Sequence, residues 1–244
     1  MSGSMTTVTT NLPARYRDGD YIAGWDEACR NPGTSEAEAV ASELMSRVAH
    51  NVDVLVQRLD AAGWRWAHPA YRRRTPDWDD ERAVTAIENA IGPLPLALRA
   101  LLLRVGEVSL CGNHPSWSPP AYAFDDLRDY PVMADPLVLP SATWMLEELS
   151  DWDADEWNEP KRPWEFGFAP DELAKANVSG RAQVITLPTA DQDPVIDNVD
   201  WHRPGTTLVS YLRSAFSFGG FPGFEFRTPV PPLIADLSRG LLPF

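Results

Sequence analysis

The chain has 244 residues, and its hydrophobic content of 44% is sufficient for a substantial buried core. The formal net charge of -14 disfavours binding to nucleic-acid phosphates or anionic lipid, because both are negatively charged, and it favours a cationic partner. Cys29 and Cys111 lack metal-ligand spacing, and no apolar stretch has the length of a membrane span or a signal peptide, so we expect a cytoplasmic protein with reduced thiols.

The first quarter of the chain predicts a flexible arm and then a long helix. Residues 1–33 contain Gly, Pro, Asp and Thr without periodicity, which is typical of a loosely held arm. Ser35 and Glu38 have capping-box spacing, and Gly63 is a stop signal, so residues 34–63 are predicted to form an amphipathic helical extension. Its buried face is expected to hold Val40, Leu44, Val48, Val52, Leu55 and Leu59.

The remaining elements predict an α+β fold. Two helices are expected at 79–91 and 95–105, each followed by a glycine, and another at 206–216. The helix at 95–105 is expected to bury Leu98, Leu101, Leu102 and Val105, and the helix at 206–216 is expected to bury Leu208, Tyr211, Leu212 and Phe216 or Ala215. Short strands are expected at 64–66, 108–110, 137–139, 166–168, 184–187 and 195–199. Because helices precede a run of strands without regular alternation, we predict a single domain, 34–244, with a central mixed or antiparallel sheet flanked by helices.

The stretch FSFGGFPGF at 216–224 raises the question of a phosphate-binding loop. Such a loop places glycines before a helix, whereas here the predicted helix comes first. Gly219 and Gly220 instead fit a left-handed helix cap, and Pro222 prevents the helix from continuing. We therefore predict a structural role, in which the phenylalanines fold back onto the core.

Several motifs in register between residues 83 and 225 resemble the SUKH superfamily, and more narrowly its longer bacterial branch. They are IENAIGPLPLALRALLLRVGEVSLCGNHPSW (87–117), DPLVL (135–139), FAPDELAKANVSG (168–180), VITLP (184–188) and VSYLRSAFSFGGFPGF (209–224). One departure follows Gly180, where Arg181, Ala182 and Gln183 replace a second glycine and an aromatic residue.

The resemblance implies a compact α+β domain with a mixed sheet. Many members of the superfamily are immunity proteins that neutralise polymorphic toxins, often nucleases or deaminases, and fungal relatives are regulatory adaptors. No enzymatic activity is common to the family. The resemblance therefore favours a protein that acts by binding another protein.

Charge is concentrated in the segment 147–172, which has ten acidic and two basic residues and three interleaved tryptophans. Carboxylates beside tryptophans are typical of an interface with a basic protein. The alternative is a solvated acidic loop whose tryptophans pack inward. The residues predicted to bind the partner are Asp151, Trp152, Asp153, Asp155, Glu156, Trp157 and Glu159.

No metal or cofactor is expected. Asp151, Asp153 and Asp155 have the spacing of the first EF-hand ligands, but Glu156 stands where the loop needs glycine and Arg162 where it needs glutamate. The four histidines form no ligand pair.

His114 and Trp117 belong to a loop of possible functional interest, GNHPSW, after a predicted strand. The histidine could take part in catalysis, or it could lock the loop through backbone hydrogen bonds. Lys175 could pair with Asp171 or Glu172 across a short helical turn.

We therefore expect a non-catalytic cytoplasmic immunity protein that covers the active site of a basic toxin with an acidic surface. A regulatory adaptor and an enzyme centred on His114 are the alternatives.

Overall fold

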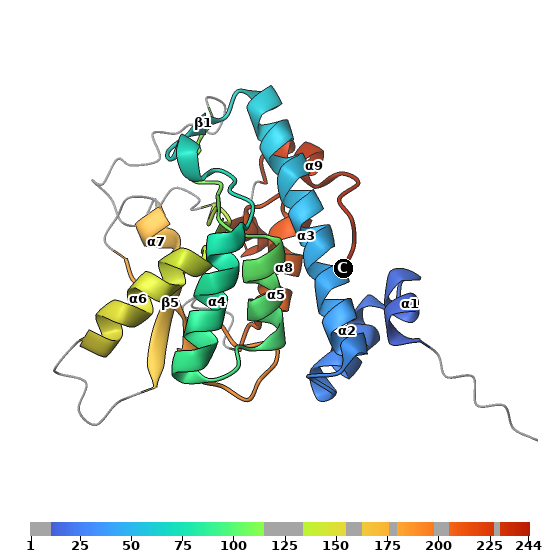
Figure 1. Ribbon diagram of the computed structural model, residues 1–244. Coiled ribbons are helices and arrows are strands. Elements are labelled where there is room, and N and C mark those ends of the chain that lie inside the picture. Colours follow the sequence, from blue (N-terminus) through green and yellow to red (C-terminus); the bar gives the residue numbers. More distant parts are fainter. Residues whose placement is uncertain (1–10, 115–133, 155–162, 176–179, 198–204, 227–229) are drawn as a thin grey trace, which may run out of the picture.

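The computed structural model describes residues 11–114, 134–154, 163–175, 180–197, 205–226 and 230–244 (Figure 1). The α+β class is confirmed. Four of the predicted partner-binding residues, Asp155, Glu156, Trp157 and Glu159, lie outside these ranges, as does Trp117 of the predicted loop. The first helices are α1 (Leu12–Arg17), α2 (Tyr21–Arg30), α3 (Ser35–Ala62), α4 (Trp78–Ile91) and α5 (Leu96–Arg104).

The flexible arm predicted for 1–33 is wrong for residues 11–33, which contain α1 and α2. Both helices pack on α3 and bury Tyr16 and Trp25. The indole nitrogen of Trp25 donates to Asp193 at 3.0 Å, a residue far along the chain. The helices are short, so this tertiary packing, rather than a long periodic pattern, holds them in place.

Helix α3 is part of the core and not an extension. The predicted apolar stripe from Val40 to Leu59 is confirmed as buried, but the N-cap is Thr34 rather than Ser35: its hydroxyl accepts the backbone N–H of Ala37. Asn51, buried in the middle of α3, exchanges two hydrogen bonds with the backbone of Leu242. These bonds fasten the C-terminal residues beside α3, where Figure 1 shows them.

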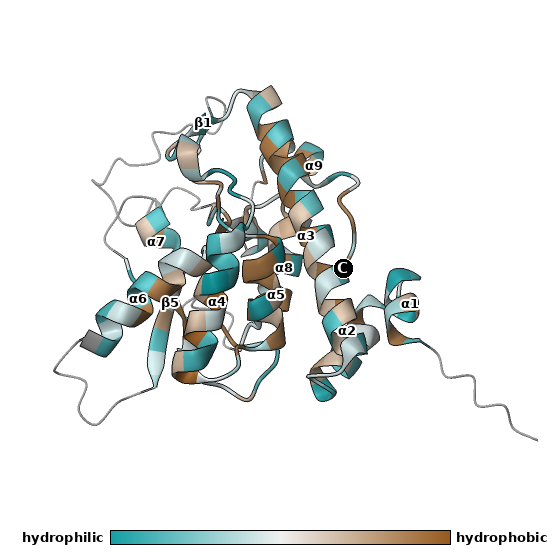
Figure 2. Cartoon of the chain, viewed as in Figure 1, coloured by the Kyte–Doolittle hydropathy of each residue, from teal (hydrophilic) through white to brown (hydrophobic). Residues whose placement is uncertain are grey.

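The middle of the core is formed by α5, which lies between α3 and α4 and is largely apolar in Figure 2. The predicted stripe of Leu98, Leu101, Leu102 and Val105 is fully buried. Helix α4 begins with a capping box between Asp77 and Asp80. Amphipathic helices can bury their apolar faces against one another, and α3, α4 and α5 form a helical layer in this way.

The described strands form three antiparallel pairs, each of two strands, rather than one continuous sheet. The pairs join β1 (Arg65–Trp66) with β3 (Gly112–Asn113), β2 (Val108–Ser109) with β4 (Val138–Leu139), and β5 (Trp164–Pro170) with β6 (Ala182–Leu187). The strand predicted at 195–199 is wrong in its described part, where Val195 and Asp197 form only isolated bridges. Strands β4 and β5 approach one another, so two of the pairs meet.

Besides α1 and α2, two further helices were not predicted: α6 (Ala142–Ala154), which packs on α4 and β5, and α9 (Pro232–Ser238), which packs on α3. The other elements are α7 (Glu172–Lys175), α8 (Leu208–Ser217) and the 3-10 turns η1 (Pro69–Tyr71) and η4 (Pro222–Phe226). No helix in the described ranges combines the length and the apolar character that crossing a bilayer requires.

The stretch FSFGGFPGF has the predicted structural role. Gly219 and Gly220 have φ angles of 61° and 90°, and the Gly220 N–H closes the end of α8 by donating to Ala215 O at 2.7 Å. A Cβ at Gly220 would lie 2.5 Å from Leu110 Cδ1, so the close approach also requires glycine. Phe221 and Phe224 are buried, as predicted.

Candidate functional site

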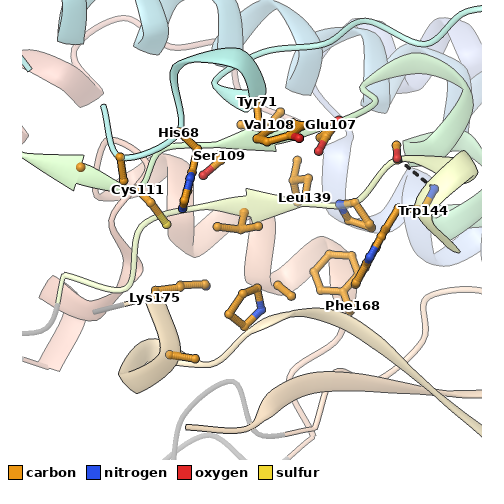
Figure 3. A pocket seen from close by; sticks show the side chains of 18 of the residues that line it. His68, Tyr71, Glu107, Val108, Ser109, Cys111, Leu139, Trp144, Phe168 and Lys175 are labelled. Atoms are coloured by element: carbon orange, nitrogen blue, oxygen red, sulfur yellow. Dashed lines mark hydrogen bonds between the residues drawn. The ribbon is translucent and has the colours of Figure 1, made fainter. Parts of the chain in front are cut away.

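A pocket of about 740 Å³ opens where the pair β2–β4 meets the pair β5–β6 (Figure 3). Its walls come from both pairs, from the start of α6, from α7 and from the segment 65–71. The lining is largely apolar and includes Leu139 and Phe168. Tyr71 and Trp144 also line it, and they are 54% and 36% exposed, which is unusual for large aromatic residues. The pocket was not predicted, because its walls are far apart in sequence.

A buried ion pair lies at the α7 side of this pocket. Lys175 Nζ is 2.6 Å from Asp135 Oδ1 and 3.3 Å from the Tyr211 hydroxyl, and the two charged side chains are 0% and 5% exposed. The predicted pairing of Lys175 with Asp171 or Glu172 is therefore wrong. Asp171 instead accepts the backbone N–H groups of Ala174 and Arg181.

The ion pair keeps Lys175 protonated. Burial alone would lower the pKa of the lysine, but the neighbouring Asp135 carboxylate outweighs that effect and raises the pKa above its ordinary value. Burial raises the pKa of the Tyr211 hydroxyl and of the Cys111 thiol, and Cys111 lines the same pocket. In these protonation states Lys175 and Cys111 are poor nucleophiles.

His114 has a structural contact. Its Nε2 lies 2.9 Å from the carbonyl oxygen of Ala62, the last residue of α3. This bond ties the segment after β3 to the end of the long helix, as expected for the locking role that the sequence left open. His114 is not part of the pocket lining. Trp117, its predicted companion, lies outside the described residues.

The acidic segment begins on α6. Asp151 and Asp153 are exposed as predicted, whereas Trp152 is half-buried and packs against the core. Trp164 is buried on β5, so the inward-packing alternative holds for this residue. A composition-based prediction could not separate the two outcomes, because it did not identify α6 as a helix.

We define the acidic stripe as Glu147, Glu148 and Asp151. These residues follow Trp144 at intervals of three, four and seven, so they share its side of α6. Glu148 accepts the backbone N–H of Gly167 on β5 at 3.2 Å, and Trp144 packs on Phe166 of the same strand. The stripe therefore runs from the pocket along the α6–β5 edge.

Electrostatics within the stripe are unfavourable. Burial raises the pKa of Glu148, and the nearby Asp151 carboxylate raises it further. The last turn of α6 contains no basic residue that could offset the negative end of the helix dipole. Among the described residues, no ion pair reaches any of the three stripe carboxylates.

A second carboxylate group near the pocket shares one arginine. Arg74 donates to both oxygens of the fully buried Asp80, at 2.9 and 3.0 Å, and to Glu107 at 3.2 Å. Glu107 lines the pocket, and Arg74 provides one positive charge for these two carboxylates, so the group keeps a net negative charge. The negative charge of this face therefore comes from Glu107 as well as from the acidic stripe.

The described residues contain no group of three or more side chains that could hold a metal ion. No family model, curated protein or solved structure matches the chain.

Proposed function

We propose that this protein is a non-catalytic cytoplasmic binding protein, of the immunity type, which neutralises a basic protein toxin by covering its active site. The observation that supports the proposal is the acidic stripe, which lies outward on an ordered helix with the exposed Trp144 at its pocket end. Aromatic anchors next to complementary charge are typical of protein interfaces. The resemblance to the SUKH superfamily is a separate, sequence-based reason for the same proposal.

A cationic partner would relieve an energetic cost that the free protein carries. Three carboxylates lie on one side of the same helix, and one of them, Asp151, is in the last turn, near the negative end of the dipole. Arginine or lysine residues of a partner would offset both the mutual repulsion and the dipole. Complementary charge of this kind mainly accelerates association and makes it sensitive to salt.

Catalysis is not needed for this function, and the reactive groups near the pocket are in unreactive states. Lys175 is held as an ammonium ion by Asp135, and Cys111 is held as a thiol by burial. The enzyme alternative centred on His114 receives no support from the ring's contact with Ala62.

The test is co-expression with the toxin encoded beside the gene. We expect the two proteins to co-purify and growth to be restored. The double variant Glu147→Lys/Asp151→Lys is expected to weaken binding by more than about tenfold, mostly through slower association. Glu36→Lys on α3, an exposed charge reversal away from the pocket, is the matched control. Absence of both complex and rescue would contradict the proposal.

The adaptor alternative requires a different experiment from deletion of the N-terminal helices. Removing residues 1–63 would remove α3, whose buried stripe belongs to the main core. The exposed large hydrophobic side chain in residues 11–63 is Ile22 on α2, which is 59% exposed. Ile22→Asp tests the adaptor reading without unfolding the domain: loss of host-protein binding in this variant alone would favour the adaptor.

A further inference from the structure

We propose that the pocket holds an extended segment of the partner, with a bulky apolar side chain between the pocket walls and a basic side chain on the acidic stripe. This inference rests on the proposed function and specifies the chemistry that the partner must present. The two halves of the site, apolar pocket and acidic stripe, are joined by Trp144, which lines the first and begins the second.

The pocket is suited to an apolar anchor. Tyr71 and Trp144 stand partly exposed at its walls, and Leu139 and Phe168 provide apolar surface deeper inside. Its volume of about 740 Å³ is several times that of one side chain, so it can hold an anchor and its flanking residues. Burial of an aromatic or leucine anchor in such a pocket is the usual origin of an interface hot spot.

The pocket also offers polar groups to a peptide backbone. Asn113 lines it, and an asparagine amide can both donate and accept hydrogen bonds. The Ser109 hydroxyl lines it as well. A few convergent polar groups in an apolar site orient a bound segment rather than supply its main affinity.

The spacing along α6 fixes where the basic residue should lie. Glu147 and Glu148 are one helical turn from Trp144 and Asp151 is two turns away, so the carboxylates lie about 5 and 11 Å along the axis. An extended chain advances about 3.3 Å per residue. A basic residue two or three positions from the anchor therefore reaches the stripe.

Charges at the pocket ends give the segment a direction. In Figure 3, Lys175 and Cys111 lie at one end of the pocket and Trp144 at the other. Arg65 also lines the pocket and is exposed, while the charge of Lys175 is balanced by Asp135. A cationic side chain is therefore favoured at the Trp144 end, where the stripe begins, and disfavoured beside Arg65.

The test uses the peptide acetyl-Gly-Phe-Gly-Arg-Gly-amide, titrated into the full chain and followed by two-dimensional amide NMR. We expect saturable shifts at pocket residues such as Val138 and Ala174, with a dissociation constant no weaker than about 1 mM. Replacing the peptide arginine with glutamine should weaken binding about five- to tenfold and remove most of its salt dependence. Replacing the phenylalanine with glycine should abolish binding.

Variants of the protein locate the site. Ala67 is exposed and lines the pocket, whereas Ala70 in the same segment is exposed but does not line it. Ala67→Trp should occupy part of the pocket and obstruct the peptide, and Ala70→Trp should bind it normally. Equal binding by the two variants, or no saturable shift at pocket residues, overturns the proposal. So does saturable binding of indole at the pocket without binding of the peptide, which would identify a small-molecule site.

The same variants separate this inference from the proposed function. If Ala67→Trp binds the toxin normally while Glu147→Lys/Asp151→Lys does not, the pocket segment is wrong and the acidic interface stands. If the peptide binds as expected but no toxin complex forms, the pocket segment stands as a peptide site and the immunity function is wrong.

Discussion

Carboxylates lie in opposite electrostatic settings at the two ends of α6. At the start of the helix, Asp80 of α4 accepts the backbone N–H of Thr143 at 3.3 Å and two nitrogens of Arg74. Toward the other end, the acidic stripe reaches the last turn with Asp151, near the negative end of the dipole, and no described residue forms an ion pair with the stripe. The first arrangement fastens the helix to α4, and the second leaves charge available to a partner.

The difference shows why net charge alone does not locate an interface. Asp80 is fully buried, so its charge is stable only because hydrogen bonds and Arg74 surround it. Glu147 and Asp151 are exposed, so water can stabilise them without a partner. Carboxylates of the first kind contribute to folding, whereas those of the second kind can change partners at little cost to stability.

The largest effect is expected at the buried pair beside the pocket. Lys175→Met would leave Asp135 buried without its counter-charge and should lower the free energy of unfolding by about 3–5 kcal/mol, measured in urea. The double variant Lys175→Met/Asp135→Asn removes both charges, and asparagine tolerates the φ of 47° at this position. It should recover part of the loss. Equal losses in the single and double variants would show that packing rather than charge is responsible.

Arg74→Met removes the cation that pairs with Asp80 beside the start of α6, and we expect it to lower the free energy of unfolding by about 3 kcal/mol. Burial alone would raise the pKa of Asp80, but hydrogen bonds from Arg74 and the Asp77 backbone outweigh it, so the pKa lies below its ordinary value. The stability contributed by ionised Asp80 is therefore present above the ordinary pKa and lost as the pH falls through the folded value.

Arg74→Met should reduce this loss of stability at acidic pH, which we call the acid limb, in urea unfolding measured at several pH values. Arg82→Met provides the control. Arg82 is exposed on α4, the helix that contains Asp80, and its Nη1 lies 3.8 Å from Asp79 Oδ1. An unchanged acid limb in Arg74→Met would show that Asp80 does not depend on this arginine.

The elements that sequence predicted were those with local signals. Helices α3, α5 and α8 combine apolar periodicity with caps or terminal glycines, and their buried faces were predicted correctly. Helix α6 has buried Ala142, Met145 and Leu149 at helical intervals, but the surrounding acidic residues obscured this pattern. Helices α1 and α2 depend on contacts such as Trp25 with Asp193, which no local pattern contains.

The candidate site was predicted only in part. The exposed acids of α6 follow from composition, and Asp151 and Asp153 are where a charged surface was expected. The pocket and the Lys175–Asp135 pair could not be predicted, because the pair joins residues separated by 40 positions. The rarity of lysine was the one available signal, since Lys161 and Lys175 are the only two in the chain.

Charge reversal sharpens the comparison between the two ends of α6. Glu147→Lys/Asp151→Lys places a cation at position 151, in the last turn of α6 and near the negative end of the dipole, so we expect the free energy of unfolding to rise by about 0.3–1 kcal/mol at low salt. Asp80→Asn, beside the opposite end, should lower it, because Arg74 loses the carboxylate with which it pairs. Urea unfolding at two salt concentrations measures both changes, and the gain from the Lys double variant should shrink at high salt. A loss of stability in the Lys double variant would show that the stripe already has favourable contacts.

The smallest effect concerns Glu148, the half-buried member of the acidic stripe. Burial and the Asp151 carboxylate raise its pKa, so the folded protein binds this proton more tightly than the unfolded chain does. The resulting stability is present below the ordinary pKa and is lost as the pH rises through the folded value. Glu148→Gln should therefore raise the free energy of unfolding at neutral pH, by less than about 1 kcal/mol because the group remains partly hydrated. At about pH 3, roughly one unit below the ordinary pKa of a glutamate, the substitution should have no effect. The amide oxygen of the glutamine can still accept the N–H of Gly167, so the variant keeps that hydrogen bond. A loss of stability at neutral pH would therefore mean that the fold favours the ionised carboxylate of Glu148.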